Sequence, residues 1–125
     1  MTAMHRPFDE VRVRDALLTA WSLETAIQWT ADNPASGQCN VTAAVIHDLF
    51  GGEVLRTRLG EVWHYYNRID GVRIDLTDSQ FTAPGARFAA PASYEDAPTT
   101  REAALATIPA REYQALHGAL VSLLV

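Results

Sequence analysis

The 125-residue chain is 48% hydrophobic, which is enough apolar material for one compact domain over residues 1–125 with a single core. Its formal net charge of −5 disfavours a nucleic-acid partner, because phosphate binding requires a basic surface. All ten basic residues are arginines, so the chain has no lysine to act as a Schiff base, a general base or a P-loop cation.

Two features of the chain indicate its compartment. The single cysteine, Cys39, cannot form an internal disulfide, so nothing requires an oxidising environment. Residues 1–7 lack the apolar stretch of a signal peptide, and no apolar run approaches the length of a membrane span. We therefore expect a cytoplasmic protein that does not interact with membranes.

The N-terminal third is predicted to be helical. Residues 8–21 form a first helix, whose apolar face is predicted to hold Val11, Leu17, Leu18 and Trp21. Ser22 to Trp29 is predicted to form a second, short helix, which Asp32-Asn33-Pro34 ends.

The middle of the chain has the clearest pattern. The apolar run from Cys39 to Phe50 predicts a helix, and Gly51-Gly52 ends it. A strand over 53–58 follows. Two further strands, 61–69 and 72–76, flank Asp70-Gly71, a strong signal for a type I′ hairpin.

The C-terminal part begins with a segment over 83–98 that is rich in alanine, proline and glycine and is predicted to be irregular. A short helix starts at Thr100. A longer helix over 110–124 presents Tyr113, Leu116, Leu120 and Leu124 on one face. The chain is thus predicted to be an α+β domain, in which N-terminal helices, including the cysteine-bearing helix, pack on a small antiparallel sheet.

Cys39 is the first candidate functional residue, because it lies where a loop turns into a helix. The positive end of the helix dipole favours the thiolate there, and the thiolate is the nucleophilic form. A buried, inert thiol is the alternative interpretation. The thiol needs a histidine and an orienting acid nearby to act as a catalytic nucleophile.

The hairpin register supplies both groups. If Asp70-Gly71 is a two-residue loop, Ile69 pairs with Val72, and His64 and Asp75 become diagonal neighbours on one face with Cβ atoms roughly 7 Å apart or less. A carboxylate at this distance fixes the tautomer of an imidazole and stabilises its cation. The alternatives are a structural histidine and an aspartate that bonds local backbone at a strand end.

Two more residues are candidates for an oxyanion hole or for the pocket wall. Gln38 precedes Cys39 and offers a side-chain amide, beside the free backbone N–H groups of the helix start. Tyr66 neighbours Asp75 across the hairpin. A structural role is the alternative for each. The histidines, acids and cysteine show no metal-ligand spacing, and we expect neither a metal nor a cofactor.

These residues carry a resemblance to a known family. Gly37-Gln38-Cys39, Phe50-Gly51-Gly52-Glu53, His64-Tyr65-Tyr66-Asn67 and Ile74-Asp75-Leu76-Thr77 are similar to the bacterial YunG-like family. The resemblance covers about half of the chain, roughly residues 21–81. This family name implies no established activity.

More distantly, the pattern resembles the papain-like and transglutaminase-like thiol enzymes, in which a cysteine at a helix start precedes a histidine and an aspartate on successive strands. The resemblance implies that Cys39, His64 and Asp75 occupy these positions.

Two functions follow from the sequence. The first is a thiol enzyme, an amide or acyl hydrolase or an acyltransferase, acting on an unidentified amide or acyl substrate such as a protein or peptide. The second is a non-catalytic binding or assembly module that forms a homo-oligomer through its apolar C-terminal helix, which ends in Val121-Ser122-Leu123-Leu124-Val125.

Overall fold

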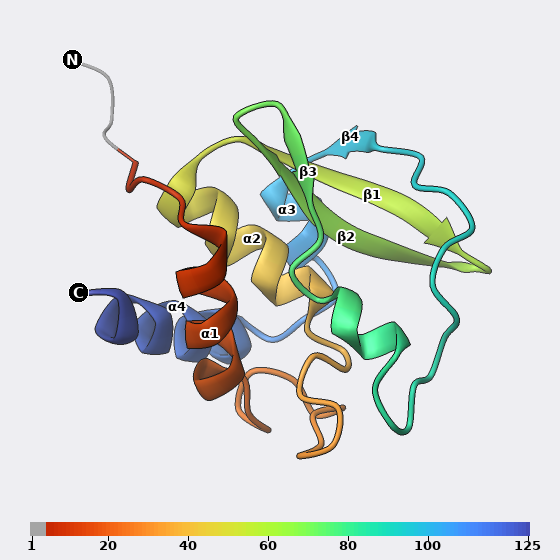
Figure 1. Ribbon diagram of the computed structural model, residues 1–125, viewed down its shortest axis with the longest axis horizontal. Helices are drawn as coiled ribbons and strands as arrows, with labels where there is room; N and C mark the ends of the chain where they lie inside the picture. Colours follow the sequence, from red (N-terminus) through yellow and green to blue (C-terminus); the bar gives the residue numbers. More distant parts are fainter. Residues whose placement is uncertain (1–4) are drawn as a thin grey trace.

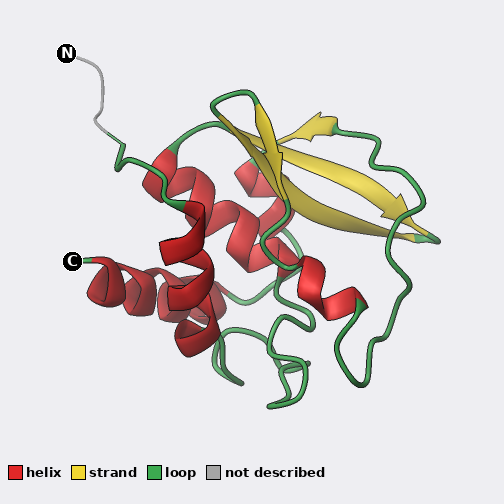
Figure 2. Cartoon of the chain, in the orientation of Figure 1, coloured by secondary structure: helices red, strands yellow, loops and turns green. Residues whose placement is uncertain are grey.

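Residues 5–125 are described by a computed structural model; residues 1–4, part of the segment expected to lack a signal peptide, lie outside the described residues. Helices and a sheet occupy separate layers (Figure 1, Figure 2). The helices are α1 (Glu10–Ala20), α2 (Cys39–Phe50), the 3-10 helix η1 (Asp78–Phe81), α3 (Arg101–Leu105) and α4 (Ala110–Leu124). The antiparallel sheet holds β1 (Glu53–Leu59), β2 (Val62–Ile69), β3 (Val72–Ile74) and β4 (Ala97–Thr99) in the order β3-β2-β1-β4. The predicted α+β class is confirmed.

The cysteine-bearing helix α2 is the centre of the fold. It lies between the sheet and the pair formed by α1 and α4 (Figure 1). Its predicted bounds are confirmed, and it ends where Gly51 adopts a φ of 81° and donates its N–H to His47 O. Packing on both sides requires an apolar helix, and its buried residues are Val41, Thr42, Ala43, Ala44, Val45, Ile46, Leu49 and Phe50.

The β2–β3 hairpin has the predicted register. Ile69 pairs with Val72 and Asn67 pairs with Ile74. Asp70 and Gly71 both have positive φ values, 52° and 78°, as a type I′ turn requires. The strand predicted over residues 72–76 is shorter than expected, because β3 ends at Ile74. The first half of β2 therefore has no partner on the β3 side.

The buried face of α1 differs from the prediction. Val13, Ala16, Leu17 and Ala20 are buried, at the i, i+3, i+4, i+7 spacing of a helix face. Val11 and Leu18 are instead 80% and 57% exposed. The prediction was right for Leu17 and Trp21, which are buried, and wrong for Val11 and Leu18. It followed the largest apolar side chains, whereas two small alanines complete the face that packs against the core.

The predicted second helix over residues 22–29 is absent; this segment forms turns. Ser22 O accepts hydrogen bonds from the N–H groups of Thr25 and Ala26, both at 3.1 Å. The Thr25 hydroxyl instead bonds to Gln38 Oε1 at 2.8 Å. Such side-chain bonds compete with helix formation, which is why threonine and serine favour turns.

Two short elements were not predicted from the sequence: η1 lies between the predicted strand over 72–76 and the predicted irregular segment over 83–98, and β4 lies at the end of that segment. Helix η1 follows Asp75, and β4 pairs with the outer edge of β1, with Pro98 opposite Leu55. An edge strand tolerates proline, so the Ala-Pro-Thr sequence gives no strand signal. We call residues 82–96 the strap; it connects η1 to β4 alongside the sheet (Figure 1).

Within the described residues, no helix is long and apolar enough to cross a membrane.

Candidate active site

His64 and Asp75 form a buried pair. The His64 side chain is 1% exposed, and its Nε2 atom lies 2.7 Å from Asp75 Oδ2. Asp75 follows directly after β3, so the hairpin holds the two residues at a fixed spacing. The sequence-derived prediction that they share one face of the hairpin agrees with this contact.

Further hydrogen bonds fix the Asp75 carboxylate. Its Oδ1 atom accepts from the Thr77 backbone N–H at 3.3 Å, and its Oδ2 atom accepts from the Tyr94 hydroxyl at 2.7 Å. The Thr77 hydroxyl in turn accepts from Gln80 Nε2 at 2.9 Å. The carboxylate therefore has little freedom to turn away from His64.

The strap covers the outer face of the sheet around this pair. Asp96 accepts from both the Tyr66 hydroxyl, at 2.8 Å, and the Arg73 guanidinium, with two contacts of 2.7 Å. Tyr66 also stacks on His64, with ring centroids 5.9 Å apart. Tyr66 does not line the cleft, contrary to the sequence prediction, because the strap buries it beneath Tyr94.

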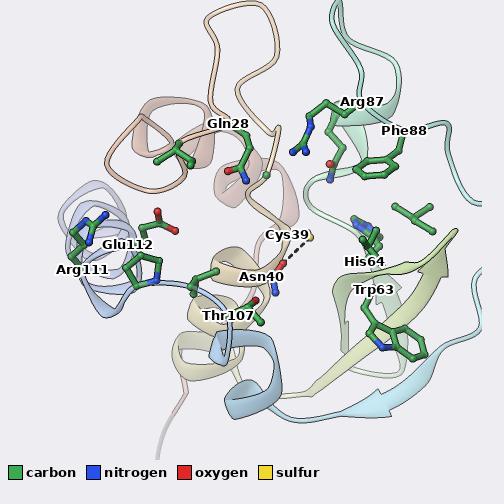
Figure 3. Close-up of a pocket in the computed structure, with 17 residues that line it drawn as sticks. Gln28, Cys39, Asn40, Trp63, His64, Arg87, Phe88, Thr107, Arg111 and Glu112 are labelled. Atoms are coloured by element: carbon green, nitrogen blue, oxygen red, sulfur yellow. Dashed lines mark hydrogen bonds between the residues drawn. The ribbon is translucent and has the colours of Figure 1, made fainter.

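Cys39 lies at the start of α2 and is partly exposed. Its Sγ atom is 3.3 Å from Asn40 Oδ1, and Asn40 is held by a hydrogen bond to Ala104 O at 2.9 Å. Cys39 and His64 line one cleft of about 370 Å³. In Figure 3 the Cys39 sulfur points across this cleft toward the His64 ring. The open edge of β2, where β3 has ended, brings His64 within reach of the α2 start.

The electrostatics of His64 favour its cation. Burial by itself lowers the pKa of His64, but the hydrogen bond to Asp75 and the neighbouring Cys39 thiol outweigh it and raise the pKa to about 9. Since Nε2 is engaged by Asp75, Nδ1 is the ring nitrogen left for Cys39. The arrangement can therefore hold a proton between a thiol and a carboxylate.

Gln38, predicted as an oxyanion donor, does not line the cleft. It is fully buried, and its Oε1 atom accepts from Thr25. As the N-cap residue of α2 it directs its side chain back into the preceding turn, which is why adjacency to Cys39 was misleading. Its Nε2 atom has no hydrogen-bond partner among the described residues.

Gln28 is a cleft residue that the sequence prediction missed. Its side chain lies against Gly37, so close that a Cβ atom added at Gly37 would be 2.4 Å from Gln28 Oε1. Gly37 also has a φ of 73°, which favours glycine. Figure 3 shows the Gln28 amide above Cys39. Gly37, two residues before Cys39, indicates in the sequence that another group packs closely there. It does not indicate that this group is the Gln28 side chain.

The comparisons with known proteins agree on one family. The sequence profile described as YunG protein matches residues 9–124. The chain belongs to the YunG family. It is 41% identical over 107 residues to the Bacillus subtilis (strain 168) protein named "Uncharacterized protein YunG", covering 86% of this chain and 87% of that protein. No solved structure matches.

Membership of the YunG family confirms the nearer of the two sequence resemblances and extends it over most of the chain. The comparisons show no relationship to papain-like or transglutaminase-like enzymes. The assignment of roles to the YunG-family residues Cys39, His64 and Asp75 therefore depends on their geometry. Among residues 5–125, no group of three or more histidine, cysteine or acidic residues is arranged to hold a metal ion.

Proposed function

We propose that this protein is a thiol enzyme acting on an amide or acyl substrate. Cys39 is the nucleophile, His64 the general acid and base, and Asp75 the residue that orients His64. The observation that carries the proposal is that Cys39 and His64 line one cleft while Asp75 occupies the Nε2 side of the same imidazole. A thiol activated by a histidine that a third group orients is the arrangement that nucleophilic catalysis requires.

The proposed reaction has two halves. The Cys39 thiolate attacks the substrate carbonyl, and the tetrahedral intermediate expels an amine or alcohol that takes a proton from His64, leaving a thioester on Cys39. Water, or an acceptor amine or alcohol, then attacks the thioester while His64 removes its proton. With water as the acceptor the protein is a hydrolase, and with an amine or alcohol it is an acyltransferase. The amide of a peptide or protein could serve as the substrate in either reaction.

The oxyanion of the intermediate needs hydrogen-bond donors. The first N–H groups of α2 have no acceptor within the helix, and the one at Cys39 is adjacent to the reacting sulfur. We assign the second donor to the Gln28 amide, which lines the cleft, in place of Gln38, which does not. The order of cysteine helix, histidine strand and aspartate is that of papain-like and transglutaminase-like enzymes, and we propose a core of that type.

The pH dependence of Cys39 alkylation by iodoacetamide tests the proposal. Because Cys39 is the only thiol, all alkylation is at this site. We expect the wild-type rate to persist into the acidic range, and His64→Ala to follow a free thiol, with a midpoint of about 8.5. His47→Ala, on the same helix, is the matched control. A wild-type midpoint at the free-thiol value, unchanged in His64→Ala, contradicts the proposal.

Acyl transfer has a second readout. With p-nitrophenyl acetate, mass spectrometry should find acetyl on Cys39 as p-nitrophenolate is released. Gln28→Ala should slow acetylation by about tenfold to several hundredfold, as removal of an oxyanion donor does. Gln114→Ala, an exposed glutamine on α4, is its control. Equal rates in both glutamine variants would remove Gln28 from the mechanism without affecting the triad.

A second candidate is the assembly module. The end of α4 leaves Leu123 and Val125 exposed, at 42% and 89%. Leu123→Ser tests it without removing Leu124, which packs against the core. Light scattering should give a larger mass for the wild type than for the variant if this surface joins two chains, whereas a monomer in both excludes assembly through α4.

A further inference from the structure

The cleft contains a buried carboxylate that the proposed reaction does not use. Glu112, near the start of α4, is 7% exposed and lines the same cleft as Cys39. Within residues 5–125, its carboxylate has no hydrogen bond or ion pair with another side chain, and Arg111 acts on it only through its charge. Its oxygen atoms are not fully enclosed by protein, so they open into the cleft. A mostly buried acid without a partner is unfavourable, because polar groups inside folded proteins are nearly always paired.

The surrounding charges compensate Glu112 only in part. Burial raises the pKa of Glu112, and Arg111 only partly opposes this shift. Arg87 and Arg111 line the same cleft, but among residues 5–125 neither forms an ion pair with the Glu112 carboxylate, which points toward the middle of the cleft (Figure 3). The dipole of α4 favours an acid in the first helical turn, but this effect supplies no hydrogen-bond partner.

We propose that Glu112 forms a subsite for a protonated amine or guanidinium of the substrate whose carbonyl is presented to Cys39. This inference rests on the proposed function, since it names the substrate class of that site. The cleft runs from His64 past Cys39 to Glu112 (Figure 3), so a cation on Glu112 and a carbonyl at Cys39 occupy different parts of one cavity. Its volume of about 370 Å³ suits a small ligand or one side chain of a peptide.

Charged thiol reagents test the subsite. Three methanethiosulfonates that carry an aminoethyl, a sulfonatoethyl or a methyl group are compared. In each case the Cys39 thiolate attacks the sulfur, a mixed disulfide forms and methanesulfinate leaves. The measured quantity is the ratio of the cationic to the anionic rate, in the wild type and in Glu112→Gln. Glu24→Gln removes an equal charge from an exposed position and is the matched control.

We expect the ratio to fall by about five- to tenfold in Glu112→Gln, because a nearby charge in a partly desolvated cleft acts oppositely on the two reagents. Glu24→Gln should leave it within about twofold. An unchanged ratio in Glu112→Gln, or an equal fall in both variants, overturns the subsite.

A competition experiment needs no variant. Butylguanidinium should slow the reaction of wild-type Cys39 with the neutral methyl reagent more than butyrate does, and equal protection by both would contradict the subsite. The neutral reagent also separates the two proposals. If its rate is independent of His64, the thiol-enzyme proposal fails, while the charge ratio still reports on Glu112.

Discussion

The Oδ2 atom of Asp75 accepts hydrogen bonds from two directions, from His64 Nε2 and from the Tyr94 hydroxyl, each at 2.7 Å. One donor comes from the hairpin and the other from the strap. The orientation of His64 therefore depends on a segment that lies far from it in sequence. Hydrogen bonds to a charged group are stronger than those between neutral groups, so both contacts matter for the position of the carboxylate.

The protonation of His64 can be followed directly. NMR of its imidazole should give a titration midpoint at about 9, because contacts with Asp75 and Cys39 raise the pKa of His64. Asp75→Asn should lower this midpoint, since the amide carries no charge to hold the proton. A midpoint that is the same in both proteins contradicts the role of Asp75.

The same shift makes folding depend on pH. The folded-state pKa of His64, about 9, lies above the unfolded value of 6.5, so its proton stabilises the fold fully below pH 6.5 and this contribution is lost as the pH rises through about 9. Urea unfolding should therefore show a larger loss of stability between pH 6 and pH 9 in the wild type than in His64→Gln, and equal losses would contradict the assignment of this shift to His64.

Tyr94→Phe removes one hydrogen bond to Asp75 and leaves the ring in place. We expect the free energy of unfolding to fall by about 1.5–3 kcal/mol, as for a hydrogen bond to a charged group. Tyr65→Phe removes an equivalent hydroxyl that does not contact Asp75. Urea denaturation of both variants measures the difference, and equal stability would show that the strap does not hold the carboxylate.

Gly37→Ala should displace Gln28 from the cleft. The added Cβ would lie 2.4 Å from Gln28 Oε1, and Gly37 has a φ of 73°. Gly85 has a similar φ of 76° with nothing near its Cβ position, so Gly85→Ala reports the backbone strain alone, of about 1 kcal/mol. Thermal unfolding should show a greater loss in Gly37→Ala. A loss no greater than in Gly85→Ala would mean that Gln28 moves aside freely.

The two adjacent leucines of α1 test which face of the helix is buried. Leu17 is fully buried and Leu18 is 57% exposed. Leu17→Ala should lower the free energy of unfolding by about 2–5 kcal/mol, because a core cavity remains, whereas Leu18→Ala should change it by less than about 0.5 kcal/mol. Denaturant unfolding of both variants measures the difference. Similar losses of stability in the two variants would show that Leu18 is also buried, as the sequence predicted.

The elements that the sequence predicted well are those that local chemistry determines. Asp70-Gly71 fixes the hairpin register through the positive φ values of its two residues. In this register Asn67 pairs with Ile74 at the end of β3, and His64 and Asp75 lie just beyond that pair and in contact. The missed elements depend on distant partners. Strand β4 exists because β1 offers a free edge, and residues 22–29 form turns because Thr25 bonds to Gln38.

The sequence by itself determined that Cys39 begins a helix and that His64 and Asp75 share one face of a hairpin, because capping and strand alternation act over a few residues. Only the tertiary structure decided what surrounds them. Gln38 and Tyr66 do not line the cleft, whereas Gln28 and Glu112 do, because a cleft wall is made of side chains from separate elements. Those contacts arise from the packing of α2 and α4 and from the turns before α2, and no local pattern of residues encodes them.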